Sequence, residues 1–288
     1  MKRLVLILGA GGQLGTAMTD GMARHHEVVA RTRGELDIND VDALRSTIVS
    51  VYPDVIVNCA AYTNVDSAED HPVAALDVNA WAVRTIAHAA AEIDATIVHF
   101  STDFVFDGVA TAPYAEDDAP NPKSVYAMSK LLGEWLAADA PRHYVLRIES
   151  LFGGEKRASS VDRLLQGIIE GTTVRAFADR TVSPSFVDDV VHATCELIDR
   201  EHPFGLYHCV NTGCATWLDV AKRLADLAGR PDAAIIPVEM ATSGLRAERP
   251  KFAALSNQKI ADLGIAMPTW TDALERYVKT VRVASHQH

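Results

Sequence analysis

The amino-acid sequence predicts an α/β protein in which a doubly wound parallel sheet is followed by a smaller C-terminal α/β lobe. Three observations favour this fold class. Aliphatic runs of strand length alternate with helical stretches through the first two hundred residues. A glycine-rich loop follows the first run, and the alternation becomes looser after Ile148. Strands that are apolar at nearly every position, each followed by a helix, are typical of a parallel sheet covered on both faces.

The elements of the sheet are expected in regular alternation along the chain. Strands are predicted over residues 3–8, 27–30, 55–58, 96–100 and 144–148, where aliphatic residues predominate. Helices are predicted between them over residues 14–24, 41–51, 73–93 and 125–138, where apolar residues recur at helical spacing. This order predicts a Rossmann-like arrangement, in which ligands bind beyond the carboxyl ends of the strands.

The rest of the chain predicts a second, smaller substrate-binding lobe. Helices are expected over residues 161–170, 186–199, 217–229 and 271–283, and short strands over 173–177, 206–209 and 234–237. We interpret residues 1–148 as a dinucleotide-binding domain, to which elements of about 186–210 return. Residues 149–185 and 211–288 are then the substrate-binding lobe. No linker rich in Pro, Gly or Ser marks the boundary.

Composition and charge exclude several classes of function. The 288 residues carry a net charge of −11 and no block of Lys and Arg, which argues against a general nucleic-acid binder. The apolar run at the N-terminus is short and ends in glycines, and no stretch approaches the ~20 apolar residues of a membrane span. The four cysteines lack a CxxC spacing and the eleven histidines an HExxH motif. We therefore expect a cytoplasmic protein with reduced thiols.

A glycine-rich loop directly after the first strand predicts a dinucleotide site. The sequence VLILGAGGQLG has the spacing GxxGxxG, at Gly9, Gly12 and Gly15, rather than GxGxxG. Glycines permit the tight turn, the close approach of a pyrophosphate and the close packing of helix on strand. The N-terminus of the following helix offers N–H groups to the phosphates. We expect Gln13 and Leu14 to contact the cofactor as well.

The end of the second predicted strand favours NADPH over NADH. A carboxylate at this place would bind the ribose hydroxyls of NAD, but the sequence VVARTRGELD has Arg31 and Arg33 there. Two guanidinium groups suit a 2′-phosphate. Asp37 lies further on, and we expect it and Ile38 to contact the adenine.

A hydroxyl and a Tyr/Lys pair predict proton-transfer chemistry. Ser101 and Thr102 end the fourth predicted strand, and only one of them is expected to face the ligand because strand side chains alternate. Tyr126 and Lys130 lie one helical turn apart on one face. A nearby ammonium is expected to lower the pKa of a tyrosine, which can then protonate a carbonyl oxygen.

These residues resemble the extended short-chain dehydrogenase/reductase family, and most closely its dTDP-4-dehydrorhamnose reductases. The resemblance rests on the motifs GAGGQLG, NCAAYTNVDSAE, VNA at 78–80, STDFVFDG, PKSVYAMSKLLGE, DRTVSPSFVDDV and RPKFAALSNQKIADLGI with a following Trp270. It implies NAD(P)H-dependent reduction of the 4-keto group of a nucleotide-diphosphate sugar, catalysed by Thr102, Tyr126 and Lys130.

The resemblance also implies where the two ligands bind. The NCAAYT segment, at Ala60, Ala61 and Tyr62, is expected at the dinucleotide together with Tyr126 and Lys130. Val65, Asp66 and Asn79 are expected to shape that neighbourhood. The residues expected at the substrate are Thr102, Asp103, Phe104 and Ser150, with Arg249 and Lys251, and less firmly Arg180, for its pyrophosphate.

The chain departs from the family pattern at two places. Where these reductases typically have R-T-x-W, the chain has Arg147-Ile148-Glu149-Ser150, so an aromatic residue at the sugar is missing and a carboxylate is added. We expect a different sugar, for example one with an amino or an extra polar group. Ala17 stands where some relatives carry a glutamate linked to a magnesium-bridged dimer, so no essential metal is expected, although a homodimer is possible.

Other functions of the same fold stay open. An epimerase would use the same three catalytic residues and retain its cofactor. A dehydratase would have an acidic pair after the threonine, but here Asp103 is followed by Phe104. A non-catalytic regulatory subunit, like the partner of methionine adenosyltransferase, would not need a tuned tyrosine.

Overall fold

The computed structural model describes residues 2–285 and contains a six-stranded parallel sheet. Its strand order is β10-β5-β4-β3-β1-β2. The strands are β1 (Leu4–Leu8), β2 (Glu27–Arg31), β3 (Val55–Asn58), β4 (Thr96–Thr102), β5 (His143–Ile148) and β10 (Gly205–His208). Every neighbouring pair is parallel. The predicted doubly wound fold is confirmed, and the five strands predicted first are found within one or two residues of the expected bounds.

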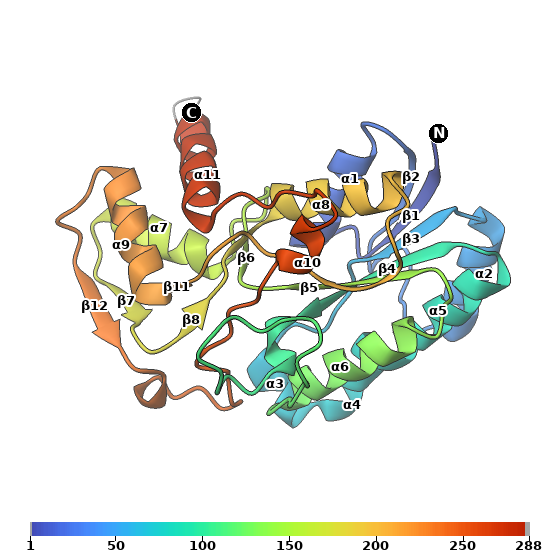
Figure 1. Ribbon diagram of the computed structural model, residues 1–288, viewed down its shortest axis with the longest axis horizontal. Coiled ribbons are helices and arrows are strands. Elements are labelled where there is room, and N and C mark those ends of the chain that lie inside the picture. Colours follow the sequence, from blue (N-terminus) through green and yellow to red (C-terminus); the bar gives the residue numbers. More distant parts are fainter. Residues whose placement is uncertain (1, 286–288) are drawn as a thin grey trace.

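Helices cover both faces of this sheet (Figure 1). α1 (Gln13–Met22) and α8 (Val187–Asp199) pack on one face, and α2 (Val41–Val51), α5 (Ala82–Glu92) and α6 (Val125–Ala137) pack on the other. The alternation of side chains along β1 explains the two cores: Val5 and Ile7 join the first, whereas Leu6 and Leu8 join the second. A strand buried on both sides therefore reads as an unbroken aliphatic run.

One predicted helix is divided into three segments. In place of a single helix over 73–93, the structure has α4 (Pro72–Leu76), a π-helical turn η1 (Asp77–Trp81) and α5. The turn contains the buried Asn79, whose amide binds the backbone N–H and C=O of Tyr62 and the hydroxyl of Ser129. An additional short helix, α3 (Val65–Asp70), was not predicted and is capped by the side chain of Asn64.

The smaller lobe consists of helices around three short two-stranded sheets. Its helices are α7 (Ser160–Glu170), α9 (Trp217–Ala228), α10 (Gln258–Ala261) and α11 (Trp270–Ser285), with a 3₁₀ turn at η3 (Met240–Thr242). Another 3₁₀ turn, η2 (Asp103–Val105), directly follows β4 of the large sheet. The paired strands are β6 (Leu151–Phe152) with β9 (Ser185–Phe186), β7 (Val174–Phe177) with β12 (Ile235–Val238), and β8 (Thr181–Val182) with β11 (Ala215–Thr216). The two-residue strands were not predicted.

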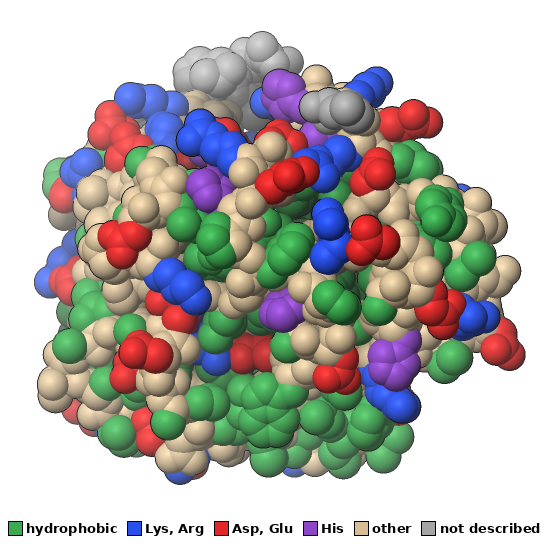
Figure 2. All heavy atoms as spheres, turned by 45° about the vertical axis from the view of Figure 1, so that its right-hand side comes forward, with side chains coloured by type: hydrophobic (Ala, Val, Ile, Leu, Met, Phe, Trp, Pro, Cys, Tyr) green, Lys and Arg blue, Asp and Glu red, His purple; other side chains and the backbone are tan. Residues whose placement is uncertain are grey.

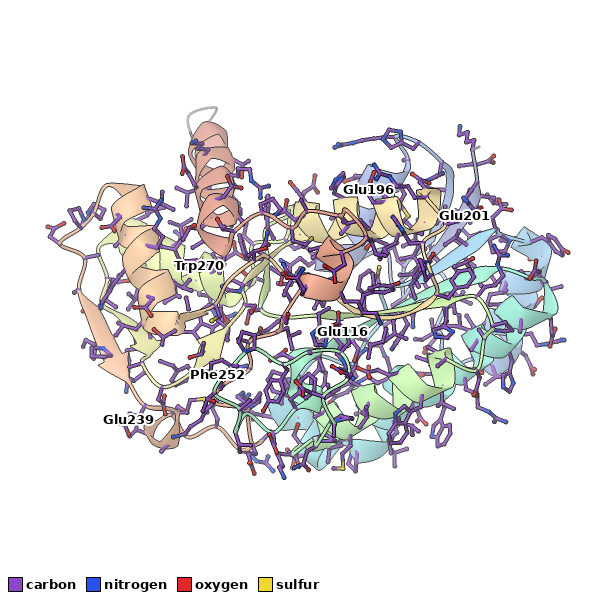
Figure 3. The ribbon with its side chains drawn as sticks, in the orientation of Figure 1. Glu116, Glu196, Glu201, Glu239, Phe252 and Trp270 are labelled. Atoms are coloured by element: carbon purple, nitrogen blue, oxygen red, sulfur yellow. The ribbon has the colours of Figure 1, made fainter. Side chains whose placement is uncertain are left out.

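The segment with α8 and β10 belongs spatially to the large sheet. β10 pairs with β5, and α8 packs beside α1 on the face of the first core. Glu116, near the middle of Figure 3, accepts a hydrogen bond of 2.8 Å from the backbone N–H of His208 and so joins the loop after η2 to β10. We retain the predicted domain boundaries as a proposal that accommodates this return of the chain.

The surface is of mixed charge. Figure 2 shows a face on which acidic and basic side chains lie interspersed among apolar ones. Among residues 2–285, no helix is both long enough and apolar enough to cross a membrane.

Candidate active site

The glycine loop lies between β1 and α1, and two of its glycines stand where no side chain fits. Gly9 has a φ of +74°, and a Cβ atom added to it would lie 2.6 Å from the backbone nitrogen of Ala60. A Cβ atom on Gly15 would lie 2.2 Å from the carbonyl oxygen of Gly9. Gly12 caps α1 without a side-chain hydrogen bond, so the first N–H groups of the helix have no side-chain acceptor. The loop therefore has the features that a bound pyrophosphate needs.

A cavity opens beside this loop, and we call it the loop cavity. Its lining includes most of the residues predicted to bind the dinucleotide, namely Gly9, Gly12, Arg33, Asp37, Ile38, Ala60, Ala61 and Tyr62. Of the two predicted arginines, only Arg33 is among the lining residues, since Arg31 donates a hydrogen bond to the carbonyl oxygen of Ala30. Gly15 does not line the cavity, and its role is to let α1 pack closely on the loop.

A second cavity adjoins the first at the carboxyl ends of β4 and β5. This strand-end cavity shares Gly12, Cys59 and Ala61 with the loop cavity. It brings together the predicted residues Gln13, Leu14, Thr102, Asp103, Phe104, Tyr126, Lys130 and Ser150. Residues not expected there are Cys59, Thr63, Leu151, Ser160 and Trp217. The predicted catalytic residues thus face one space that is continuous with the glycine loop.

α6 presents Tyr126 and Lys130 to the strand-end cavity. The helix begins after Ser124, whose hydroxyl accepts a hydrogen bond from the N–H of Ala127. The ring of Tyr126 packs edge-on against Phe104, with the ring centroids 5.5 Å apart. The ammonium of Lys130 donates to the carbonyl oxygen of Phe100 at 2.6 Å. Both side chains are buried and are held by the first two turns of one helix.

The expected effect of Lys130 on the tyrosine is wrong for this structure. Burial raises the pKa of Tyr126, the Asp103 carboxylate raises it further, and only a hydrogen bond with the Thr102 hydroxyl lowers it. The ammonium of Lys130 is directed to the Phe100 carbonyl instead of the phenol. Burial also lowers the pKa of Lys130 to about 8, against the attraction of Glu134. Tyr126 is therefore a protonated phenol at neutral pH.

The structure separates the two hydroxyls at the end of β4. Ser101 donates to a carboxylate oxygen of Glu134 at 2.5 Å, and the same carboxylate is held by both ends of the Arg147 guanidinium at 2.8 Å. Thr102 instead faces Tyr126 and donates to Oδ1 of Asp103 at 2.9 Å. As the alternation along a strand requires, one hydroxyl lies at the tyrosine and the other is used in the core.

Three charged side chains are buried at the wall of the strand-end cavity. Asp103 and Glu149 are 3% and 1% exposed, and the Arg180 guanidinium lies 3.8 Å from Asp103 and 5.2 Å from the ring centre of Phe104. Burial raises the pKa of Asp103 to about 6 and that of Glu149 well above its usual range. Arg180 was expected, less firmly, at a pyrophosphate; it lies against these carboxyls and also lines the strand-end cavity.

Arginines line a third cavity that adjoins the strand-end cavity through Ser160, Arg180 and Trp217. This arginine cavity is also lined by Arg163, Arg175, Phe177 and Thr172. Position 150 carries no aromatic side chain, but the indole of Trp217 from α9 borders both cavities. Apart from Arg180, sequence reasoning missed these residues because they come from elements with no fixed spacing to the catalytic motifs.

The two cations predicted more firmly for the pyrophosphate, Arg249 and Lys251, lie outside these cavities. Arg249 forms a two-fold ion pair with Asp66, at 2.9 Å and 3.0 Å. Lys251 is 66% exposed at its side chain and lies 3.4 Å from Asp179. Neither residue is among those that line the three cavities described above.

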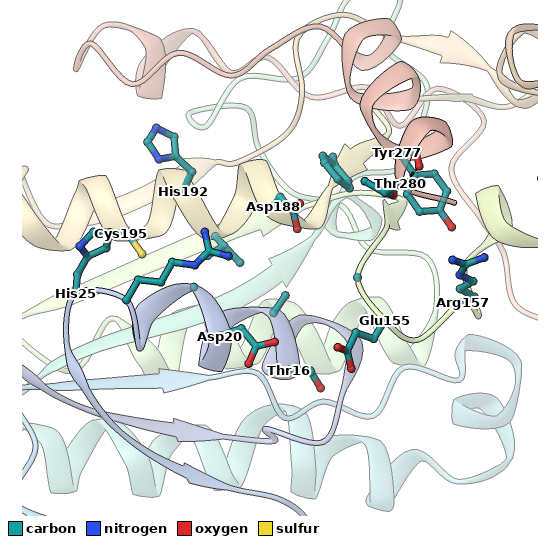
Figure 4. Close-up of a pocket in the computed structure, with 16 residues that line it drawn as sticks. Thr16, Asp20, His25, Glu155, Arg157, Asp188, His192, Cys195, Tyr277 and Thr280 are labelled. Atoms are coloured by element: carbon teal, nitrogen blue, oxygen red, sulfur yellow. Dashed lines mark hydrogen bonds between the residues drawn. The ribbon is translucent and has the colours of Figure 1, made fainter. Parts of the chain in front are cut away.

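A separate cavity lies between α1, α8 and α11 (Figure 4). Its lining includes Ala17, the position at which some relatives carry a glutamate. Asp20, Glu155 and Asp188 surround it together with Arg157. Within residues 2–285, no group of three or more His, Cys, Asp or Glu side chains is arranged to hold a metal ion.

A doubly wound sheet with a glycine loop, and a cavity that holds Thr102, Tyr126 and Lys130, define a protein of the short-chain dehydrogenase/reductase type. The chain belongs to the family described as RmlD substrate binding domain, whose model matches residues 1–283.

Two relatives and one solved structure illustrate this membership. The dTDP-4-dehydrorhamnose reductase of Mycolicibacterium smegmatis is 34% identical over 285 residues, which cover 98% of this chain and 86% of the relative. The spore coat polysaccharide biosynthesis protein SpsK of Bacillus subtilis is 33% identical over 276 residues, or 96% of each chain. The crystal structure of the Bacillus anthracis dTDP-4-dehydrorhamnose reductase in complex with NADP superposes on this chain with a TM-score of 0.91 and 30% sequence identity. The match covers 96% of this chain and 99% of the Bacillus anthracis chain.

Proposed function

We propose that this protein is an NADPH-dependent reductase of the 4-keto group of a nucleotide-diphosphate sugar, in the manner of the dTDP-4-dehydrorhamnose reductases. The observation that carries the proposal is the shared cavity of Thr102, Tyr126 and Lys130, which is continuous with the cavity of the glycine loop. The names of the Mycolicibacterium and Bacillus anthracis relatives support the same activity.

The loop cavity fits a nicotinamide dinucleotide. Gly9 and Gly15 leave space that a Cβ atom would fill, and the N-terminus of α1 has no side-chain cap. Gly12 and Ala61 would lie along the dinucleotide, and Arg33 would pair with a 2′-phosphate. When bound, the cofactor supplies a hydride to the carbonyl carbon of the sugar.

The chain's own residues supply the proton and the position of the carbonyl group. Tyr126 donates its phenolic proton to the carbonyl oxygen, and its raised pKa keeps that proton available at neutral pH. Thr102 stands beside the phenol in the same cavity and would orient the same oxygen. Lys130 places a buried positive charge near the oxyanion that begins to form, which favours the transition state.

The substrate is proposed to extend from the strand-end cavity into the arginine cavity. Its sugar would lie between Phe104, Ser150 and Trp217, and its diphosphate would meet Arg163 and Arg175. Arg249 and Lys251 remain proposed contacts only for a part of the nucleotide that projects out of these cavities.

A direct test is to follow NADPH oxidation over a panel of 4-keto nucleotide sugars and to repeat it with NADH. We expect turnover with at least one member of the panel and faster turnover with NADPH. Oxidised cofactor should accumulate in stoichiometric excess over the enzyme. Sugar conversion without net cofactor oxidation would indicate an epimerase instead. No turnover, together with a co-purifying protein, would indicate a regulatory subunit.

The choice of cofactor is tested by a matched pair of variants. Arg33→Ala is expected to raise the KM for NADPH about tenfold and leave that for NADH nearly unchanged, because one charged contact to a phosphate is lost. Arg31→Ala is the control, since this side chain binds its own chain and does not line the cavity. Equal effects of the two variants would contradict the assignment of Arg33.

A further inference from the structure

The acidic motif NVDSAED forms α3 and its cap, and its carboxylates take no part in the proposed reaction. Three acidic side chains on a six-residue helix repel one another, since they stand three or four residues apart. Each of them has a partner on another element. Asp66 and Asp70 bind a segment of the smaller lobe, whereas Glu69 binds the helix α6. The helix therefore depends on these partners for its stability.

Asp66 binds a segment of the smaller lobe that we call the clasp, residues 246–253. Its carboxylate accepts the backbone N–H groups of Arg246 and Ala247 at 3.2 Å and 3.0 Å. It also accepts both ends of the Arg249 guanidinium, at 2.9 Å and 3.0 Å. These hydrogen bonds use about the full acceptor capacity of a carboxylate. The hydrogen bond from Arg249 lowers the pKa of Asp66 to about 2, so the contact stays charged far below neutral pH.

The clasp continues from α3 to the wall of the strand-end cavity. The carbonyl oxygen of Lys251 accepts the backbone N–H of Thr181 at 2.8 Å, and Thr181 directly follows Arg180, which lines that cavity. Figure 1 shows the clasp passing beside α3 on its way from η3 to α10. The chain from residue 247 to residue 251 spans at most ~14 Å even when it is extended. α3 of the larger domain and β8 of the smaller lobe are therefore held close together.

α3 also contacts the helix that carries Tyr126. A carboxylate oxygen of Glu69 accepts the backbone N–H of Val125 at 2.9 Å, in the first turn of α6. An N–H group in that turn has no partner within its own helix. Ala68 is fully buried and belongs to the same hydrophobic cluster as Tyr126, against which Val125 packs as well. The position of α3 thus bears directly on the position of the phenol.

The two ion pairs between α3 and the clasp differ in burial. Asp70 pairs with Arg246, but their side chains are 47% and 60% exposed, and water screens such pairs. In the pair of Asp66 with Arg249 the side chains are 35% and 13% exposed. Loss of either partner there leaves a partly buried charge unpaired. Asp66 is therefore the principal contact with the clasp, and Asp70 provides a matched control.

We propose that α3 couples the smaller lobe to Tyr126, and that Asp66 and Glu69 are positioning residues for the proton donor. The clasp fixes α3 through Asp66, and α3 fixes the start of α6 through Glu69 and Ala68. A sugar nucleotide that spans both lobes would then meet a phenol that is already in place. The effect on catalysis rests on the proposed reductase function, whereas the coupling of the clasp to α6 is a property of the protein alone.

Hydrogen exchange of single backbone amides, measured by NMR on the full-length protein, tests the coupling without any turnover. Arg249→Ala breaks the ion pair from the side of the clasp and leaves the sequence of α3 unchanged. We expect about tenfold faster exchange at the N–H groups of Arg246 and Ala247, the effect of weakening one set of hydrogen bonds. Through α3, exchange at the N–H of Val125 should become faster as well. Faster exchange confined to the clasp, or none at all, would overturn the proposal.

Kinetics with a turned-over sugar tests the positioning role. Asp66→Ala and Glu69→Ala are each expected to lower kcat about tenfold, and Asp70→Ala should change it by less than twofold. Glu69→Gln should restore most of the loss, because its amide oxygen still accepts the N–H of Val125. The double variant Asp66→Ala/Glu69→Ala should be little worse than either single variant, because the two residues act in series.

Two kinetic outcomes would contradict the role of α3. They are a wild-type kcat in Asp66→Ala, and fully additive losses in the double variant. Thermal unfolding and titration with NADPH measure how much of each variant is folded, so that a smaller amount of folded enzyme is not taken for a lower kcat. The exchange result stands even if no sugar is turned over, and it then separates failure of the coupling from failure of the proposed function.

Discussion

Lys130 is a buried cation whose charge opposes folding. Its ammonium has the carbonyl oxygen of Phe100 as a hydrogen-bond partner and the Glu134 carboxylate as a nearby opposite charge. Burial nevertheless lowers its pKa from 10.5 to about 8. A lysine with a lowered pKa in the folded state binds its proton more weakly there than in the unfolded chain. The resulting penalty is therefore fully present below about pH 8 and disappears as the pH rises above the unfolded value.

Replacement of this lysine should raise the stability of the protein and lower its activity. Lys130→Met keeps the length of the side chain and removes the charge, so the free energy of unfolding at pH 7 is expected to rise by on the order of 1–2 kcal/mol after loss of one hydrogen bond. Turnover should fall strongly. Denaturant unfolding of both proteins at pH 7 and pH 10 measures this, and the gain should be smaller at pH 10. A variant less stable than the wild-type protein at pH 7 would contradict it.

Tyr126 is expected to be the general acid. Tyr126→Phe should lower kcat by ~10²-fold or more, within the usual range for a lost proton donor, and should leave cofactor affinity nearly intact. Stopped-flow reduction and a cofactor titration by fluorescence separate the two effects. Thr102→Val should reduce kcat less, because it leaves the proton donor Tyr126 in place. Full activity of Tyr126→Phe would refute the proposed mechanism.

At the scale of elements, α6 is positioned by its close packing on η1. A Cβ atom on Gly133 would lie only 2.1 Å from the carbonyl oxygen of Asn79, so helix and π-turn meet there without space for a side chain. Asn79 in turn holds the backbone of Tyr62 at the wall of the loop cavity. One packing contact thus fixes α6, with Tyr126 and Lys130, and the segment of Tyr62 relative to each other.

A single methyl group added at this contact should lower the stability of the protein. Gly133→Ala is expected to destabilise the protein by about 1–3 kcal/mol, the usual effect of overpacking, despite the better helix propensity of alanine. Gly34→Ala is the matched control, because a Cβ atom there meets nothing within 4 Å. Thermal unfolding compares the two. An unchanged midpoint for Gly133→Ala would show that α6 can move away from η1 at little energetic expense.

The regular elements were predictable because their signal is local. The strands of the large sheet are aliphatic on both faces, and α2 and α6 begin after an Asp or Ser that caps them. The π-turn was not predictable, because the hydrophobic periodicity of 72–92 continues through it and only the contacts of Asn79 reveal it. Strands of two residues such as β8 and β11 depend on tertiary pairing rather than on sequence pattern.

Some residues of the candidate site were likewise predictable from local motifs, and others were not. Gly9, Tyr126 and Lys130 stand in motifs with fixed spacing, and the structure places them at the adjoining cavities that the motifs indicate. Trp217 and Arg163 come from the other lobe, where only the fold brings them to the substrate side. The direction of the Tyr126 pKa was missed because neither the burial of the phenol nor the turn of the Lys130 ammonium toward the Phe100 carbonyl can be read from two residues of sequence.

At the scale of the whole molecule, the large sheet is not made from one continuous part of the chain. β10 forms its edge beside β5, and α8 covers the first core next to α1, although both follow the short strands β6 to β9 of the smaller lobe. The dinucleotide-binding domain that we propose is therefore incomplete at residue 148.

A fragment that ends at this boundary should not fold on its own. Residues 1–148 lack the strand that pairs with β5 and the helix that covers Met18 and Met22, so we expect no cooperative thermal transition and weak near-UV circular dichroism. A fragment of residues 1–212 adds α8 and β10 and should show a more cooperative thermal transition than the fragment 1–148. Cooperative unfolding of 1–148 alone would show that the first five strands are sufficient.

The late position of β10 also affects the protein while it is being made. Residues 149–204 must be translated after β5 before its edge partner exists, and for that time the nascent chain carries a strand with free N–H and C=O groups. Such an edge can pair with strands of other chains. The efficiency of synthesis should thus depend on how quickly the ribosome passes this interval and on chaperones that shield β5 until β10 arrives.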